Sequence, residues 1–177
     1  MKIAVRGGHC PNVPGAKGIL DELTEDRKVK ESVVKYLKQL NHDVLDVTPP
    51  NSTSTSSEDL YYGVNKANNW GANLFISIHL NYYESPSVYG PMVYYQKNND
   101  SSKLLANLIQ NGLNMFTDTN KITHSGDYYL LNKTNVTGVI VECGFLSNIE
   151  ERNKLMDSSY QYGLAKTIYD SVREYLM

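Results

Sequence analysis

The chain has 177 residues, of which 41% are hydrophobic and 20% are charged, a composition typical of one folded domain rather than a disordered segment. Its formal net charge is −2, so it lacks the basic surface that duplex nucleic acid requires, and we expect no nucleic-acid partner. Its apolar stretches are far shorter than the ~20 residues that a membrane-spanning helix needs. The composition therefore predicts one globular domain without a membrane anchor.

The amino terminus leads directly into an apolar run and a glycine turn, with no stretch long enough for a signal peptide. We therefore expect a protein that is made in the cytoplasm. Cys10 and Cys143 are too few for a disulfide framework, and small, semi-buried side chains are the simplest interpretation of both.

Apolar runs and helical patterns alternate along the chain. The runs predict strands at residues 3–5, 43–47, 74–78, 90–95, 128–131 and 139–141. Helical spacing predicts a helix with Thr24 as its N-cap that runs to Asn41, and further helices over residues 57–70, 101–116 and 158–176. This alternation predicts a single α/β domain with a twisted, mostly parallel, mixed sheet of about six strands and helices on both faces.

Three of the predicted strands lead to side chains that can hold or assist a metal. His9 follows residues 3–5 through a glycine turn, His79 directly follows residues 74–78, and Glu142 directly follows residues 139–141. Open α/β sheets bind their ligands outside the carboxyl ends of the strands. We therefore expect these three side chains to meet at one edge of the sheet.

Imidazole and carboxylate groups are typical zinc ligands, and a catalytic zinc ion has three protein ligands and one position open to water. His9 and His79 are the first two candidates. Glu25, in the first turn of the predicted helix, is the third, because that turn can fold back over the strand end near His9. Glu22 is close enough to compete for this role. Glu142 follows a buried strand, where an unpartnered carboxylate is costly, which favours a functional role.

Three motifs carry a resemblance to a known family. Residues 141–148, which read Val-Glu-Cys-Gly-Phe-Leu-Ser-Asn, resemble a signature of the zinc-dependent N-acetylmuramoyl-L-alanine amidases of the third amidase family. Residues 67–68 with 73–81, and the Gly-His pair at 8–9, resemble two other signatures in the same order. The resemblance implies one zinc ion held by His9, Glu25 and His79, with Glu142 as the catalytic acid and base.

The resemblance also implies a substrate and a reaction. The family hydrolyses the amide bond between N-acetylmuramic acid and the L-alanine that begins the stem peptide of bacterial peptidoglycan. Two alternatives stay open: a zinc peptidase that cuts within the stem peptide, and a non-catalytic module that binds the cell wall.

The apparent lack of a signal peptide makes the chain more similar to phage endolysins than to secreted autolysins. Such a lysin stays in the cytoplasm of the host bacterium until it is released to the cell wall. Residues 1–177 are then expected to form the catalytic domain and to act as a monomer, and a wall-binding domain could follow Met177 in a longer protein.

Overall fold

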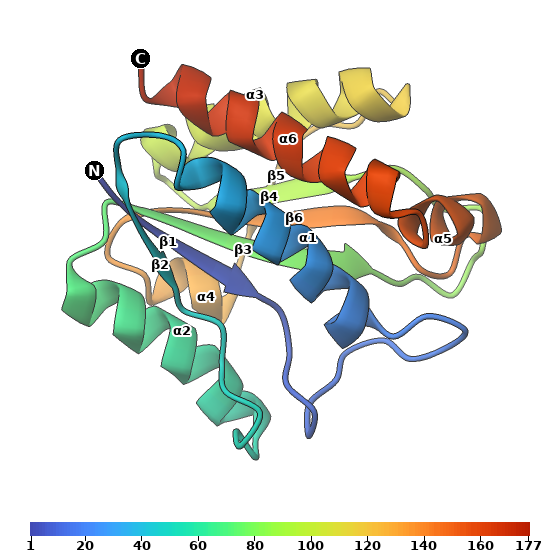
Figure 1. Cartoon of the computed structure of the whole chain (residues 1–177), viewed down its shortest axis with the longest axis horizontal. Coiled ribbons are helices and arrows are strands. Elements are labelled where there is room, and N and C mark those ends of the chain that lie inside the picture. Colours follow the sequence, from blue (N-terminus) through green and yellow to red (C-terminus); the bar gives the residue numbers. More distant parts are fainter.

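The computed structural model describes all 177 residues as six strands and six helices around one sheet (Figure 1). The strands are β1 (Lys2–Gly7), β2 (Asp43–Asp46), β3 (Leu74–Asn81), β4 (Met92–Gln96), β5 (His124–Gly126) and β6 (Thr137–Phe145). The helices are α1 (Glu22–Leu37), α2 (Ser56–Trp70), α3 (Asp100–Thr117), α4 (Tyr129–Asn132), α5 (Ile149–Leu155) and α6 (Ser158–Tyr175). None of the helices is long and apolar enough to cross a membrane.

The strands form one sheet in the order β2-β1-β3-β6-β4-β5. Strands β2, β1, β3 and β6 pair in parallel. Strand β4 runs antiparallel to β6 and parallel to β5. The sheet is therefore mixed and mostly parallel, and the predicted fold class is confirmed.

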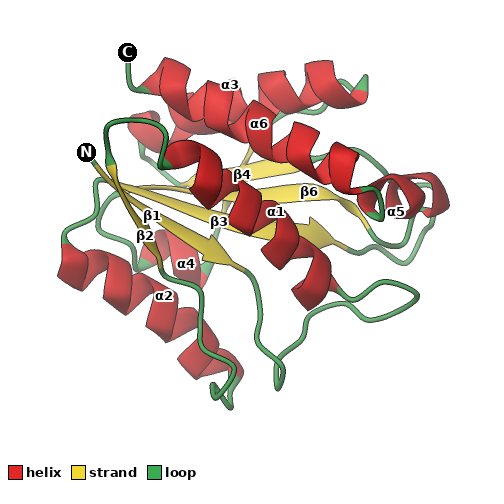
Figure 2. Cartoon of the chain, viewed as in Figure 1, coloured by secondary structure: helices red, strands yellow, loops and turns green.

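Helices cover both faces of the sheet, with α1, α3 and α6 on one side and α2 and α4 on the other (Figure 2). Neighbouring residues of β1 point to opposite faces, as they do in any strand. Ile3 and Val5 belong to the larger core with Val29 of α1, whereas Ala4 belongs to the smaller core with Val64 of α2. Because both faces are covered, the central strands are apolar along their length rather than alternating.

Helix α1 begins and ends earlier than predicted. Its N-cap is Asp21 rather than Thr24, and the Thr24 hydroxyl donates a hydrogen bond of 3.0 Å to the Asp21 carboxylate from within the first turn. The helix ends at Leu37 rather than Asn41. The backbone N–H of Leu40 bonds to the carbonyl of Leu37, three residues back, which is the tighter pattern found where helices end.

Helix α2 shows the local signals that bound it. The Thr55 side chain accepts a hydrogen bond from the backbone of Glu58, and the Glu58 side chain accepts one from the backbone of Thr55, which is a capping box. Gly71 ends the helix with a φ angle of 70°, a left-handed conformation that glycine adopts without steric cost.

The strand predicted at residues 128–131 is wrong. That segment forms the short helix α4, and the strand in this part of the chain is β5. Backbone N–H groups of Leu131 and Asn132 both bond to the carbonyl of Tyr128, which closes helical turns. Leu130 and Leu131 are buried in the smaller core, so packing on one face of the sheet determines the conformation of this run. The short helix α5 was not predicted.

Candidate metal and catalytic site

The carboxyl ends of β1, β3 and β6 lie side by side because β3 pairs in parallel with both neighbours. His79 lies opposite Glu142 in the register of β3 and β6. Gly7 of β1 lies opposite Ile78 of β3, which brings the following residues, including His9, to the same edge. His9, His79 and Glu142 line one cleft of about 420 Å³.

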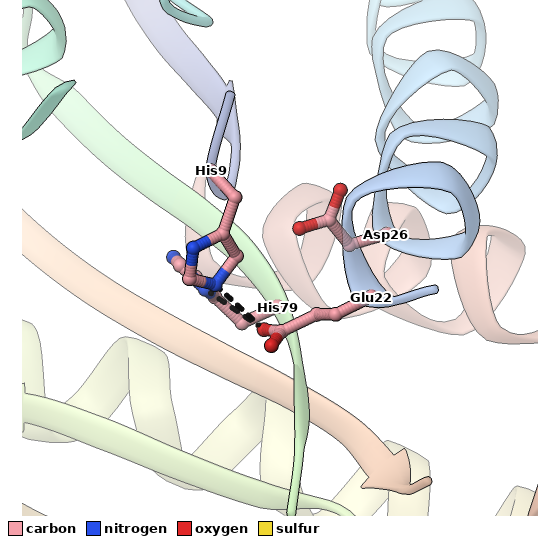
Figure 3. Close-up of side chains that lie close together, drawn as sticks. All are labelled: His9, Glu22, Asp26 and His79. Carbon is pink, nitrogen blue, oxygen red and sulfur yellow. Dashed lines mark hydrogen bonds and ion pairs between the residues drawn. The ribbon is translucent and has the colours of Figure 1, made fainter. Parts of the chain in front are cut away.

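Glu22, at the start of α1, joins the two histidines (Figure 3). Its Oε1 atom lies 2.9 Å from Nε2 of His9 and 3.5 Å from Nδ1 of His79. Its Oε2 atom accepts a hydrogen bond of 2.8 Å from the backbone N–H of Ala16. Burial alone would raise the pKa of Glu22, but hydrogen bonds with His79 and His9 outweigh burial and lower the pKa to about 2. The cluster is therefore built around an ionised carboxylate.

The prediction of Glu25 as the third member of this cluster is wrong. Its carboxylate accepts hydrogen bonds from Lys28, at 2.9 Å, and from Gln161 of α6, at 2.7 Å. Glu25 follows Glu22 by three positions, and three rotations of roughly 100° leave it roughly 60° from Glu22 around the helix axis. Glu22 therefore points to the strand ends and Glu25 points to α6. Glu22, the competing candidate, takes the place predicted for Glu25.

The loop between β1 and α1 closes tightly over this cluster. His9 has a φ angle of 61°, a left-handed conformation that is uncommon for residues other than glycine and that occurs often at functional sites. A Cβ atom at Gly8 would lie 2.5 Å from Nδ1 of His79, and one at Gly15 would lie 2.6 Å from Nε2 of His9. Both glycines are therefore needed for the close approach of the backbone to the histidines.

His79 is held from behind by polar groups of the sheet. Its Nε2 atom lies 3.0 Å from the Ser77 hydroxyl and 3.2 Å from the Arg6 guanidinium. Arg6 is fully buried and forms a salt bridge of 2.6 Å with Asp59 of α2. Burial lowers the pKa of His79 to about 4, so the imidazole is neutral at pH 7, as metal binding requires. With Nε2 held by Ser77, Nδ1 faces Glu22.

Glu142 faces the same cleft from the neighbouring strand. Its Oε2 atom is buried and has no hydrogen-bond partner. Burial, together with the charge of Glu22, raises the pKa of Glu142 to about 8 in the absence of a metal. A divalent cation in the cluster would oppose this rise. The carboxyl group is thus free to take up and release a proton.

Asp26 is a member of the cluster that sequence reasoning missed. It is fully buried, and neither of its carboxylate oxygens has a partner. Burial and the charge of Glu22 raise its pKa well above the usual value. A signal for it was present in the sequence, because Glu22 and Asp26 precede Val29 and Val33 at the spacing of one helical stripe. An acidic pair in line with core residues indicates a buried polar site.

The arrangement fits a divalent metal ion. His9, Glu22, Asp26 and His79 offer donor atoms that all lie within 4.8 Å of one another. Zinc bonds to nitrogen and oxygen are about 2.0–2.2 Å long, so small side-chain movements would bring these atoms around one ion. Two imidazoles and two carboxylates suit zinc, and the unpartnered oxygens of Asp26 lie where a cation would compensate their charge.

Comparison with known proteins supports the same interpretation. A family model described as N-acetylmuramoyl-L-alanine amidase matches residues 3–174. An uncharacterized protein of Clostridium perfringens is 36% identical over an alignment of 157 residues that covers 85% of this chain and 45% of that protein. The germination-specific N-acetylmuramoyl-L-alanine amidase of Bacillus subtilis is 33% identical over an alignment of 121 residues that covers 67% of this chain and 51% of that protein. The chain therefore spans about half the length of these curated relatives.

Two solved structures match almost the whole fold. The CwlD amidase of Clostridioides difficile, in complex with the GerS lipoprotein, is 30% identical, with a TM-score of 0.93 and coverage of 99% of this chain and 98% of that one. The catalytic domain of CwlV from Bacillus (Paenibacillus) polymyxa var. colistinus is 31% identical, with a TM-score of 0.88 and the same coverage of both chains. The chain belongs to the N-acetylmuramoyl-L-alanine amidase family.

Proposed function

We propose that this chain hydrolyses the amide bond between N-acetylmuramic acid and L-alanine in bacterial peptidoglycan, with one zinc ion held by His9, Glu22 and His79. The observation that carries the proposal is the position of Glu142, which has an unpartnered carboxylate oxygen and lines the same cleft as the three candidate ligands. The family match supports the choice of bond.

The proposed reaction needs an acid-base group beside an activated water. Zinc bound at the cluster supplies a Lewis acid for the scissile carbonyl and a water of lowered pKa. Glu142 would accept a proton from a water in the cleft, and the resulting hydroxide would add to the scissile carbonyl carbon. Glu142 would then return the proton to the amide nitrogen as the C–N bond breaks, which frees the amino group of L-alanine and leaves a carboxylate on the sugar. Glu142 begins this cycle ionised, because a dication beside it opposes the rise in pKa that burial causes.

The walls of the cleft suit a substrate that joins a sugar to a peptide. Leu60, Tyr82, Tyr128 and Tyr129 line it beside the polar cluster. Tyrosine rings offer flat apolar surface together with a hydroxyl that can bond to polar groups. This combination favours a glycopeptide over a wholly apolar ligand.

Product analysis on purified peptidoglycan tests the choice of bond. Digestion should release stem peptides that begin with a free L-alanine, identified by mass spectrometry, with no cuts inside the peptide. Glu142→Gln is the matched control, since it keeps the shape of the side chain and removes its basicity. Fragments that begin at other residues would support the zinc peptidase alternative. A zinc-loaded chain that binds walls but releases nothing would support the wall-binding alternative.

The metal is tested on the same preparations. Removal of metal with a chelator should abolish release, and added zinc should restore it. Full activity in protein that contains no metal by elemental analysis would contradict the zinc mechanism.

The endolysin setting, the monomeric state and a wall-binding domain after Met177 stay predictions. Two relatives are named for germination and for sporulation, so the rate of digestion should be compared on vegetative walls and on spore cortex. Faster digestion of vegetative walls would support the endolysin interpretation, and faster digestion of cortex would oppose it.

A further inference from the structure

Asp26 stands out among the buried acidic residues because both of its oxygens lack a partner. Glu22 bonds to His9 and to the Ala16 backbone, and Glu25 bonds to Lys28 and Gln161. Removing an ionised carboxylate from water is expensive unless another group compensates its charge. Something absent from the protein chain should therefore complete the surroundings of Asp26.

Neighbouring cations do not fill this role. The charges of Arg6 and Arg27 act on Asp26, but both guanidinium groups bind elsewhere. Arg6 binds the Asp59 carboxylate at 2.6 Å, and Arg27 binds the carbonyl of His9 at 2.8 Å. Asp26 therefore lies near two cations and near the carboxylates of Glu22 and Glu142, without a direct partner of its own.

The side chain of Asp26 is directed at the histidine cluster. Figure 3 shows Glu22 and Asp26 extending from the same helix toward His9 and His79. A Cβ atom at Gly8 would lie 2.6 Å from Oδ2 of Asp26 and 2.5 Å from Nδ1 of His79, so these two donor atoms approach the backbone at the same point.

We propose that Asp26 is a fourth protein ligand of the metal ion, in addition to His9, Glu22 and His79. The inference rests on the metal site of the proposed function. A second carboxylate ligand would add to the compensation of a divalent cation's charge in this buried site. Water then occupies a fifth position, which zinc accepts.

The test measures zinc affinity in the full chain by competition with a chromogenic chelator. Asp26→Asn keeps the shape of the side chain and removes its charge, and it should weaken zinc binding by at least ~10-fold. Glu25→Gln is the matched control, one residue earlier on α1 and 5% exposed, and it should bind zinc as tightly as the unmodified chain.

Thermal melting gives a second readout of the same variant. The increase in melting temperature that zinc produces should be smaller in Asp26→Asn than in the unmodified chain, because a weaker site gains less stability from the same zinc concentration. An increase of the same size in the variant would overturn the inference.

Cobalt(II) spectra of the unmodified chain and of Asp26→Asn test the ligand set directly. Loss of a carboxylate ligand should change the visible absorption of bound cobalt, and identical spectra would overturn the inference. Unchanged zinc affinity in Asp26→Asn would also overturn it and would leave the proposed function intact. An unmodified chain that binds no zinc would instead refute the metal site on which both depend.

Discussion

The apolar core of the sheet and the carboxyl edge of the same sheet use burial in opposite ways. In the core, side chains such as Ile3, Ile76 and Val139 are fully buried against helices on the face they share. At the edge, some buried polar atoms have no hydrogen-bond partner. They belong to side chains of the site or to side chains around it, namely those of Arg6, His9, Asp21, Asp26, Arg27, Asp59 and Glu142.

This difference shows where the fold gains stability and where it gives some up. Each buried polar group without a partner costs roughly 1–3 kcal/mol, whereas each fully buried large apolar side chain contributes about 1.5–3 kcal/mol. The core thus offsets the cost of the edge. Unpartnered buried polar groups that destabilise the free protein are expected where a bound ligand supplies the missing partners.

Glu142→Gln should change the chemistry at the carboxyl edge and leave the apolar core intact, and it should have the largest effect of the substitutions considered. We expect the rate of peptidoglycan hydrolysis to fall by ~10²–10⁴-fold, the usual contribution of a positioned acid-base group. The fold and the zinc content should not change, because Glu142 is not among the proposed ligands. Turbidity loss of a wall suspension and elemental analysis measure the two properties. A variant that lyses walls at the unmodified rate would rule out the assigned role.

Paired substitutions on α1 test which face of the helix belongs to the site. Glu22→Gln should weaken zinc binding by ~100-fold or more, since loss of an outer partner alone typically costs 10–100-fold. Glu25→Gln should leave zinc affinity unchanged and disturb only the contacts with Lys28 and Gln161. Chelator competition measures both, and the reverse order of effects would restore Glu25 as the ligand.

A substitution in the core should lower the stability of the fold without changing zinc binding or hydrolysis. Leu105 of α3 is fully buried in the larger core, and Leu105→Ala should lower the free energy of unfolding by ~2–5 kcal/mol. Urea unfolding measures this loss. Zinc affinity and the rate of hydrolysis well below the melting temperature should stay within about twofold of the unmodified chain, as expected for an energetically independent site.

The smallest expected effect is a pH dependence of the free energy of unfolding, which comes from the buried titratable groups at the carboxyl edge. Burial raises the pKa of Glu142 from 4.5 to about 8 in the metal-free protein, so the folded chain binds more protons than the unfolded chain between these pH values. The contribution of Glu142 to the free energy of unfolding therefore falls as the pH rises from 4.5 to about 8.

His79 contributes with the opposite sign at lower pH. Burial lowers its pKa from 6.5 to about 4, so its contribution to stability is lost as the pH falls from 6.5 to about 4. Between pH 6.5 and 8 the folded chain therefore loses the contribution of Glu142, together with that of any other carboxyl group whose pKa burial raises, such as Asp26. Urea unfolding of metal-free protein measures the decline. Glu142→Gln should make it smaller, and an equal decline in the variant would assign it to another group.

Much of the site was predictable because strand ends carry their own signals. His79 and Glu142 directly follow apolar runs, and parallel pairing brings such runs to one edge. Strands β3 and β6 continue to Asn81 and Phe145, so both side chains lie within strands near their carboxyl ends rather than beyond them. Arg6 and Asp26 were harder to foresee, because a charged residue beside apolar ones is read as exposed unless its partners are known. The groups that surround them lie on elements far away in the chain: Asp59 on α2 binds Arg6, and His79 on β3 lies in one cluster with Asp26.

The sequence by itself determined the alternation of strands and helices, the apolar faces of the central strands and three of the residues at the candidate site. Only the tertiary structure decided that Glu22 rather than Glu25 faces the histidines, and that the run before residue 132 is helical. Both choices depend on packing against distant elements. Glu22 and Glu25 lie only roughly 60° apart around the helix axis, and local propensity cannot decide which of them faces the histidines and which contacts α6.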